Sequence, residues 1–293
     1  MNFTSIHGFV DSVEYNEYTN RQLLVVPLSV LALALVVISY VFFTTGAPVG
    51  LGLDFSGGTE IRVVPDDSVS SPEETLSGAF SVEPSNIRTV PSDNSYVVTF
   101  SQSGDYDATQ AQNEAQASGF VVRASSSVSP AIGGEAQRFA IIGFGVAFSA
   151  MSLLVFGLFR TFVPSVAVVA SAFSDIIVPV ALMNIFGIDL TLGTVAALLL
   201  LVGYSVDSDM LLNDYVVRRR GDVHTAVKSA METGLTMSIT SLIAMSVLAT
   251  GSLILGISIL QDIGTIIAFG LAVDIMNTYM MNVALLRYFR GEY

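Results

Sequence analysis

The sequence predicts a polytopic α-helical membrane protein with six transmembrane helices and a small α+β extracytoplasmic domain between helices one and two. The chain has 293 residues, of which 52% are hydrophobic and only 13% are charged, a balance typical of membrane proteins. It contains six apolar stretches long enough to cross a ~30 Å hydrocarbon core, which takes roughly 20 helical residues. One long hydrophilic stretch, residues 44–138, follows the first of them.

The six expected helices span residues 23–43, 139–159, 164–187, 190–212, 234–256 and 263–286. A segment of residues 1–22 precedes them, helices two to six fill 139–290, and 291–293 form a tail. The first apolar run is longer than the hydrophobic part of a signal peptide and follows acidic residues, so we expect it to stay as a membrane helix. Six helices enclose little space, which favours a partner chain or a homo-oligomer.

The basic residues of the short loops indicate how the chain crosses the membrane. With six spans, Arg21, Arg160, the group at 218–228 and the pair at 287–290 all fall on one side. Lys and Arg in short loops mark the cytoplasmic side. We therefore expect a plasma-membrane protein with both termini in the cytoplasm and residues 44–138 outside.

The outer segment alternates strand-like and helix-like patterns. Its turn signals and apolar alternation predict the order βαββαβ, which is the ferredoxin-like split arrangement of one antiparallel sheet with two helices on one face. The expected strands are 52–64, 87–90, 96–100 and 120–123, and the expected helices are 72–80 and 106–118. Residues 125–134, rich in Ser and Gly, are predicted to be a linker to the second membrane helix.

The charge of the chain is strongly acidic. The formal net charge is −13, and residues 44–138 hold 12 acidic side chains against 4 arginines. Such a surface repels nucleic acid and anionic lipid, so no nucleic-acid partner is expected. It suits a protein from a salt-loving organism, although an ordinary acidic extracellular domain is the alternative.

The residue types that carry most catalysis and metal binding are scarce. The chain has no cysteine and two histidines, His7 and His224, neither of them at metal-ligand spacing. Gly57-Gly58 is followed by neither the helix nor the Lys that a phosphate loop requires. No Ser-His-Asp or Cys-His set is present. We therefore predict no enzymatic activity, no bound metal and no cofactor.

Four aspartates lie inside apolar runs that contain no Lys, Arg or His: Asp175, Asp207, Asp209 and Asp274. A carboxylate at the bilayer centre costs at least ~2.5–3.5 kcal/mol, so such residues are usually functional. Acids without a cationic partner either hold protons or gather around a mobile cation. The alternative is a protonated side chain that only hydrogen-bonds across helices. Three central acids on three helices favour an ion-coupled protein.

The positions of these acids suggest different roles. Asp207 lies ~16 Å of helix before the basic group at 218, too deep to reach water, whereas Asp209 is equally consistent with an interfacial acid. We expect Asp207 and Asp274 to bind the coupling cation alternately with protons. Asp175 is expected mainly to position the others.

Two further side chains are candidates for the same ion pathway. Asn277 follows Asp274 at i+3 on one helix face. Thr236 is one of several hydroxyl residues of helix five that could bind a cation or relay a proton.

Two motifs resemble a known family. The run Gly52-Leu53-Asp54-Phe55-Ser56-Gly57-Gly58-Thr59 resembles the G-x-D-F-x-G-G-T signature of the SecD/SecF protein-export family, within the resistance-nodulation-division superfamily. The run Gly203-Tyr204-Ser205 is similar to that of the SecF branch. Gly57 and Gly58, beside a strand, also suggest a bulge or a close backbone approach.

The resemblance covers the whole chain and carries functional expectations. It implies an auxiliary subunit of the Sec protein translocase that works with SecD in a twelve-helix unit. Its further partners would be the Sec translocon channel and exported preproteins, and an ion gradient would drive the process. A half-unit of a small-molecule or lipid exporter is the alternative, and a static membrane scaffold is a third reading.

The sequence departs from the family pattern at three places. The family follows Gly-Tyr-Ser with a hydrophobic residue and then Asn-Asp, whereas this chain has Val206 and then Asp207-Ser208-Asp209, so either Asp is a candidate for the role. The family arginine of helix five falls near Thr236, where no basic residue stands. Asp175 matches a family aspartate, but Ser174 replaces the preceding His.

Overall fold

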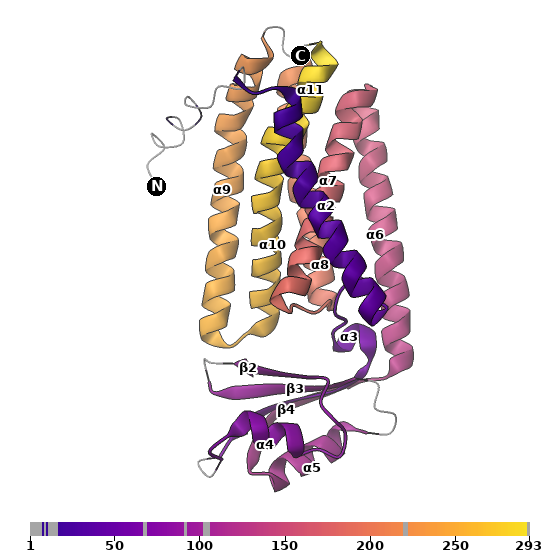
Figure 1. The fold of residues 1–293 in the computed structure, drawn as a ribbon, viewed down its shortest axis with the longest axis vertical. Coiled ribbons are helices and arrows are strands. Elements are labelled where there is room, and N and C mark those ends of the chain that lie inside the picture. The colour runs from indigo at the N-terminus through magenta and orange to yellow at the C-terminus, as the bar shows by residue number, and fades with distance from the viewer. Residues whose placement is uncertain are drawn as a thin grey trace.

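The computed structural model describes residues 8, 10, 17–66, 69–90, 93–101, 106–218 and 222–291. A helical bundle stands on a small sheet domain, which lies at one end of it (Figure 1). Six helices are long and apolar enough to cross a membrane, and the predicted fold class is confirmed. Most of the predicted segment 1–22, Arg219, Arg220 and tail residues 292–293 lie outside the described residues.

The bundle runs antiparallel from one end of the molecule to the other. Its elements are α2 (Asn20–Thr45), α6 (Pro130–Phe159), α7 (Phe162–Phe186), α8 (Leu192–Arg218), α9 (Val223–Leu255) and a last helix made of α10 (Ser258–Met276), the π-helix η2 (Asn277–Asn282) and α11 (Val283–Arg290). α2, α7 and α9 end at Gly46, Gly187 and Gly256, whose positive φ angles only glycine adopts easily. The helices are longer than the predicted spans. The prediction followed the apolar runs, whereas the first and last turns of the helices carry polar residues.

The sheet domain has the predicted split topology. Its elements are α3 (Leu53–Ser56), β1 (Gly58–Pro65), α4 (Pro72–Gly78), β2 (Asn86–Val90), β3 (Ser95–Ser101), α5 (Ala108–Ala117) and β4 (Phe120–Val128). The strand order is β2-β3-β1-β4, with antiparallel neighbours throughout. Helices α4 and α5 cover the face away from the bundle (Figure 1). Their small or apolar residues, such as Leu76 and Ala111, complete a core with Ile61, Val98 and Phe100.

Two local predictions are wrong. Residues 52–57 form the helical turn α3 instead of the start of a strand, because the chain turns there under the bundle. Residues 125–134 are no linker: β4 continues to Val128, and Pro130 begins α6 with the Ser129 hydroxyl capping it. Pro at the first helical turn is favourable, so the same proline that suggested a loop starts a helix.

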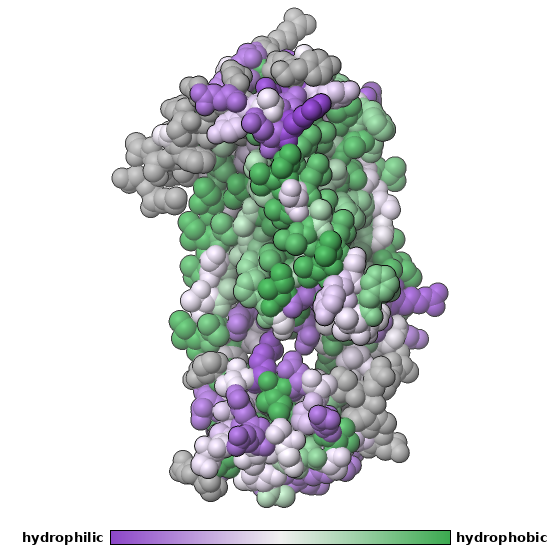
Figure 2. Space-filling view, in the orientation of Figure 1, coloured by the Kyte–Doolittle hydropathy of each residue, from purple (hydrophilic) through white to green (hydrophobic). Residues whose placement is uncertain are grey.

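The helices differ in how far they are covered by the rest of the chain. α7, α8 and α10 form the centre of the bundle, whereas α2, α6 and α9 are mostly exposed. On the face that Figure 2 shows, hydrophobic side chains cover the bundle between two more hydrophilic ends. The chain is therefore a multi-pass membrane protein whose polar residues in the centre are sheltered from lipid.

Candidate ion-coupling site in the helix bundle

The segment after α2 joins the sheet domain to the loop between α7 and α8. The Gly52 N–H donates to the Leu190 carbonyl at 2.8 Å, and the Leu190 N–H donates to the Gly50 carbonyl at 2.7 Å. A Cβ on Gly52 would lie 2.7 Å from Thr191 Cγ2 and 3.0 Å from the Leu190 oxygen. Only glycine fits this close approach without displacement.

Asp54 connects the same segment to helix α8. Its Oδ2 accepts a hydrogen bond from the backbone N–H of Leu192, the first residue of α8, at 2.9 Å. The first N–H groups of a helix have no partner within the helix, and an acid there also complements the helix dipole. The sheet domain thus caps the first N–H of α8, in addition to Thr191, whose hydroxyl accepts from the Thr194 N–H at 3.2 Å.

The rest of the signature fixes the sheet domain against α6. Phe55 is buried, and its carbonyl accepts a bond from Gln137 Nε2 at 2.7 Å and leaves no room for a Cβ at Gly133. Gly57 and Gly58 have φ angles of +67° and +122°, a backbone conformation that glycine adopts far more readily than other residues. The buried Thr59 hydroxyl donates to the Tyr106 carbonyl at 3.2 Å.

Three of the four intramembrane aspartates are buried in the centre of the bundle. Asp175 of α7 and Asp209 of α8 are 0% exposed, and Asp274 of α10 is 1% exposed. Segments 161–217 and 229–286, which contain them, hold no Lys, Arg or His. Their hydrogen-bonding partners are hydroxyls and amides.

Asp175 is held by side chains of three helices. Ser205 Oγ of α8 donates to its Oδ2 at 2.6 Å, and Asn277 Nδ2 of η2 donates to its Oδ1 at 2.6 Å. Ser171, one turn earlier on α7, lies 3.3 Å from the Oδ2. The Ser of the Gly-Tyr-Ser run therefore orients an aspartate of the neighbouring helix.

Asp209 and Asp274 share the hydroxyl of Thr278. Thr278 Oγ1 lies 2.7 Å from Asp209 Oδ1 and 3.4 Å from Asp274 Oδ1. Asn282 Nδ2 also donates to Asp209 Oδ1. Ser208 Oγ lies 2.9 and 3.0 Å from the two oxygens of Asp274. These contacts form a polar network across α7, α8 and α10 that can hold or pass a proton or a cation.

The π-helix η2 supplies three members of this network. A π-helical turn holds an extra residue, is rare in proteins and often occurs at functional sites. Here it directs Asn277, Thr278 and Asn282 towards the acids, and all three are 0% exposed. The network therefore depends on an irregularity in the last membrane helix.

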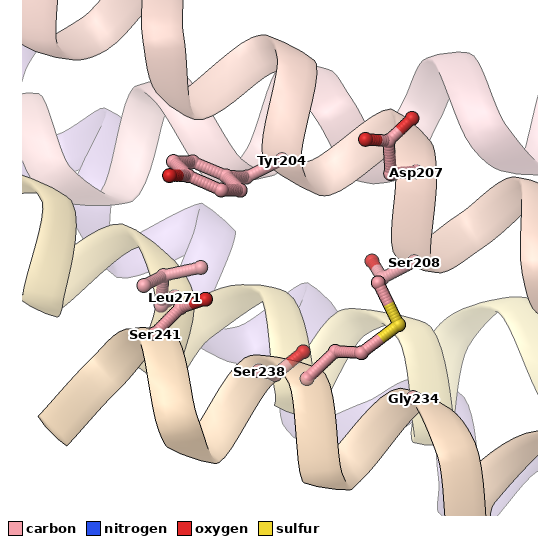
Figure 3. Close-up of a pocket in the computed structure, with 8 residues that line it drawn as sticks. Tyr204, Asp207, Ser208, Gly234, Ser238, Ser241 and Leu271 are labelled. Carbon is pink, nitrogen blue, oxygen red and sulfur yellow. The ribbon is translucent and has the colours of Figure 1, made fainter. Parts of the chain in front are cut away.

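The structure leaves Asp207 outside this network. Asp207 is exposed on the surface of the chain and lines a pocket of about 100 Å³ between α8, α9 and α10 (Figure 3). The other lining residues are Tyr204, Ser208, Gly234, Met237, Ser238, Ser241 and Leu271. Successive helical residues turn by 100°, so Asp207 and Asp209 point in nearly opposite directions.

The structure thus groups the candidate residues of the ion pathway differently from the sequence-based expectation. Asp209, rather than Asp207, shares a hydroxyl with Asp274, and Asp175 also belongs to the cluster. Thr236 donates its hydroxyl to the Glu232 carbonyl of its own helix at 2.7 Å. Sequence reasoning missed four partners of the acids: Ser171, Ser208, Thr278 and Asn282.

The i, i+4 spacing of helix neighbours identifies two of the four missed partners. Ser171 precedes Asp175 by four residues, and Thr278 follows Asp274 by four, so each pair shares a helix face. Asn282 follows Thr278 by four residues, but η2 changes the helical period there. No sequence signal separates Ser208 from the other hydroxyl residues of α8.

The chain is similar to known proteins over nearly its whole length. The family model "Protein export membrane protein SecD/SecF, C-terminal" matches residues 108–292. The protein-export membrane protein SecF of Haloferax volcanii is 54% identical over 97% of each chain. This chain belongs to the SecF family. SecF of Haloquadratum walsbyi is 50% identical over 96% of each chain, and SecF of Pyrococcus furiosus is 36% identical over 92% of this chain and 91% of its own.

A solved structure supports the same fold for the SecF family. The crystal structure of SecDF, a translocon-associated membrane protein from Thermus thermophilus, matches 93% of this chain with a TM-score of 0.75 at 24% identity. This SecF-family chain spans 38% of the length of that SecDF chain. The likeness shows a shared arrangement of membrane helices and sheet domain.

Proposed function

We propose that this SecF-family chain is an auxiliary subunit of the Sec protein translocase that works with a SecD chain to aid protein export. The process would be coupled to an ion gradient across the plasma membrane, with both termini in the cytoplasm and no enzymatic step. The full-length similarity to proteins named SecF supports the export role. The single observation that carries the ion coupling is the buried network of Asp175, Asp209 and Asp274 without a cationic side chain.

The network and the sheet domain are connected through α8. Asp209 and Ser208 of α8 take part in the network inside the bundle. At the start of the same helix, the Leu192 N–H donates a hydrogen bond to Asp54 of the sheet domain. A change in charge at Asp209 or Asp274 alters the attraction between α8 and α10. A resulting shift of α8 would reach the sheet domain through this cap and assist a preprotein leaving the Sec translocon channel.

The exposed face of α8 is evidence for a partner chain. Ala196, Leu200, Gly203 and Asp207 are exposed and follow one another at helical spacing. An ionisable side chain in the membrane normally faces protein or water and not lipid. We place SecD against this face, where it shields Asp207 from lipid. An added Cβ at Gly203 meets nothing within this chain, so a partner helix has room to approach closely.

The alternative, a half-unit of a small-molecule or lipid exporter, is less well supported. Ligand sites for small molecules usually measure about 300–1,000 Å³. The pocket beside Asp207 measures about 100 Å³, enough for a few water molecules or an ion. Its size favours ion passage over transport of an organic molecule.

The test is export of a reporter protein in cells whose only copy is a variant chain. Asp209→Asn with Asp274→Asn keeps the size of both side chains but removes their charge, so export should fall several-fold while the variant still accumulates in the membrane. Glu83→Gln, which removes the charge of an exposed acid of the sheet domain, is the control for loss of an acidic side chain. Normal export by the double variant would leave only a static role.

A further inference from the structure

The sheet domain is tied to the bundle at one end of its strands. The chain enters β1 at Gly58 and leaves β4 at Val128 for α6, and these two residues pair across the sheet. Both connections therefore lie at the same end of the strands, which Figure 1 shows under α3 and α6. The opposite end, called the far end below, lies under the turn between α9 and α10 (Figure 1). The far end meets the bundle through side chains of the sheet.

Two arginines of the far end point towards the bundle. Arg62 of β1 and Arg88 of β2 both pair with Val97 of β3, so they share one face of the sheet. Successive strand residues point to opposite faces, and Ile61, the neighbour of Arg62, lies in the core with Val98. The arginines therefore lie on the face that α4 and α5 leave free. Arg62 stands four residues, or about 13 Å of strand, from the first residue of β1.

Each arginine contacts one group of the bundle. The Arg88 guanidinium lies 3.6 Å from the Asp262 carboxylate of α10, and that of Arg62 donates to the Gly256 carbonyl at 3.3 Å. Arg62 also pairs with Asp93 of its own domain at 2.9 Å, which balances its charge. The Arg88 side chain is 43% exposed, and ion pairs that are so exposed contribute little to stability. Contacts this weak can open and close reversibly.

The same contact holds more acids than it can balance. The charged groups that face one another here are Glu60 of β1, Arg88 of β2, Asp54 of α3, Asp189 of the α7–α8 loop and Asp262 of α10. Glu60 and Asp189 are half-buried, one on the sheet and the other on the bundle. Two carboxylates brought together across a contact repel each other, and each loses water when the contact closes. Closing the contact is therefore easiest when these two side chains are neutral.

Protons on Glu60 and Asp189 favour the docked sheet. Burial raises the pKa of both carboxyl groups, although the positive charge of Arg88 opposes the shift. A docked sheet therefore binds protons more tightly than an undocked one. This contribution to docking is fully present below the unperturbed pKa values of about 4, and it is lost as the pH rises through the docked values. Figure 2 shows hydrophilic side chains around a gap between the bundle and the sheet domain, so the contact is open to water on that side.

We propose that the sheet domain swings about the Gly58 end of its strands and that Arg88 is the latch at the far end. While Glu60 and Asp189 are protonated, Arg88 holds the sheet against the α9–α10 turn. When both acids ionise, the far end is released from the bundle. The purpose of this release rests on the proposed function, because a domain that opens beside the translocon makes room for the exported chain.

The glycines of the signature provide the pivot. α3 is held by close contacts at Gly52 and Gly133, where an added Cβ would lie 2.7 and 2.8 Å from a neighbouring atom. Gly57 and Gly58, between α3 and β1, have positive φ angles that glycine adopts easily. A hinge needs only a few residues that absorb backbone rotation, and Ser129 is the one residue between β4 and α6. Rotation at these positions moves the far end of the sheet most.

The test measures the distance between two spin labels on the full-length chain in lipid nanodiscs. The protein has no cysteine, so Thr89→Cys at the far end of β2 and Leu255→Cys at the end of α9, both exposed, can carry the labels. One short distance is expected at about pH 4, and a longer one should appear as the pH rises. Arg88→Gln should increase the longer population several-fold at neutral pH. Arg123→Gln, which removes an exposed arginine of β4, is the matched control and should change nothing.

Two further measurements separate a swing from other changes. Glu60→Gln with Asp189→Asn should keep the short distance at every pH. A label pair near the fixed end, Ser126→Cys with Phe139→Cys, should keep one distance throughout, because a change there as well would mean unfolding and would contradict the swing. An Arg88→Gln chain that keeps the original distances across the pH range would overturn the latch.

A charge swap covers the case in which Arg88→Gln does not fold. Arg88→Glu should release the far end, and adding Asp262→Arg should restore the short distance by reversing the pair. No recovery in the swapped chain would overturn the pairing. Lost export in Arg88→Gln with unchanged distances would contradict the latch and leave the export role intact. A longer distance with normal export would support the latch and contradict its part in export.

Discussion

Asp54 Oδ2 lies 2.9 Å from the backbone nitrogen of Leu192, so a residue of the SecD/SecF-like signature caps the first N–H of the helix that carries Asp209. Residues 54 and 192 belong to the sheet domain and the bundle, and α8 runs from this contact to the buried acids (Figure 1). Movement of α8 along its axis must either carry the sheet domain with it or break the cap. The signature thus links the sheet domain to α8 through this hydrogen bond.

Loss of the cap should loosen the start of α8. Asp54→Ala removes the acceptor, and losing a helix cap typically costs about 0.5–2 kcal/mol of stability. Hydrogen exchange at the first turn of α8 should speed up, and export should fall. Asp54→Asn still accepts the bond and should behave nearly like the original chain. Equal defects in both variants would mean that charge, and not capping, matters at this position.

Gly52 should tolerate no side chain. Its missing Cβ would lie 2.7 Å from Thr191 Cγ2 and 3.0 Å from the Leu190 oxygen, so Gly52→Ala must separate the two segments. We expect a lower unfolding midpoint and reduced export. Gly251→Ala, where an added Cβ meets nothing within 4 Å, is the control and should be neutral or slightly stabilising. A Gly52→Ala variant as stable as the control would contradict the close approach.

Helix number, sheet topology and the presence of intramembrane acids could be predicted because apolar length, strand alternation and charge are local properties. The partners of the acids could not, since they depend on how three helices are rotated about their axes. Asp207 and Asp209 differ by two positions in sequence, yet one faces outwards and the other is buried. The π-helix that presents Asn282 reads Asn-Thr-Tyr-Met-Met-Asn, with no Gly or Pro to indicate an irregular helix.

One ion pair and one hydrogen bond join the sheet domain to the bundle, and the stability of this contact should depend on pH. Arg88 NH1 lies 3.6 Å from Asp262 Oδ2, and Arg62 NH1 donates to the Gly256 carbonyl at 3.3 Å. Burial raises the pKa of Glu60 and Asp189 beside this contact, although Arg88 opposes the shift. Both side chains are half-buried, so ionising them costs more free energy in the folded state than in the unfolded state.

The sign of the pH effect follows from these raised pKa values. The folded chain binds protons more tightly than the unfolded chain, so this contribution to stability is fully present below the unfolded values of about 4 and is lost as the pH rises through the folded values. The unfolding midpoint should therefore fall as the pH rises above about 4. Glu60→Gln with Asp189→Asn should flatten this part of the profile. An unchanged slope would exclude these two acids as its source.

The orientation of the chain can be tested because the protein contains no cysteine. Ser126 of β4 and Thr225 of α9 are both exposed and lie near opposite ends of the molecule. With an impermeant thiol reagent and intact cells, Ser126→Cys should be labelled, and Thr225→Cys should be labelled only after lysis. Labelling of position 225 in intact cells would reverse the orientation predicted from the arginines.

The two aspartates of α8 should have separable effects on assembly and coupling. Asp207 is exposed on the face that we assign to SecD, whereas Asp209 is buried in the network. Asp207→Leu removes a polar group that a partner must match, so recovery of SecD with a tagged chain from native membranes should fall several-fold. Asp209→Asn keeps this face unchanged and should recover SecD normally while export fails. If Asp207→Leu recovered as much SecD as the original chain, the partner would have to cover another face, because a carboxylate matched by SecD cannot be lost without weakening the complex.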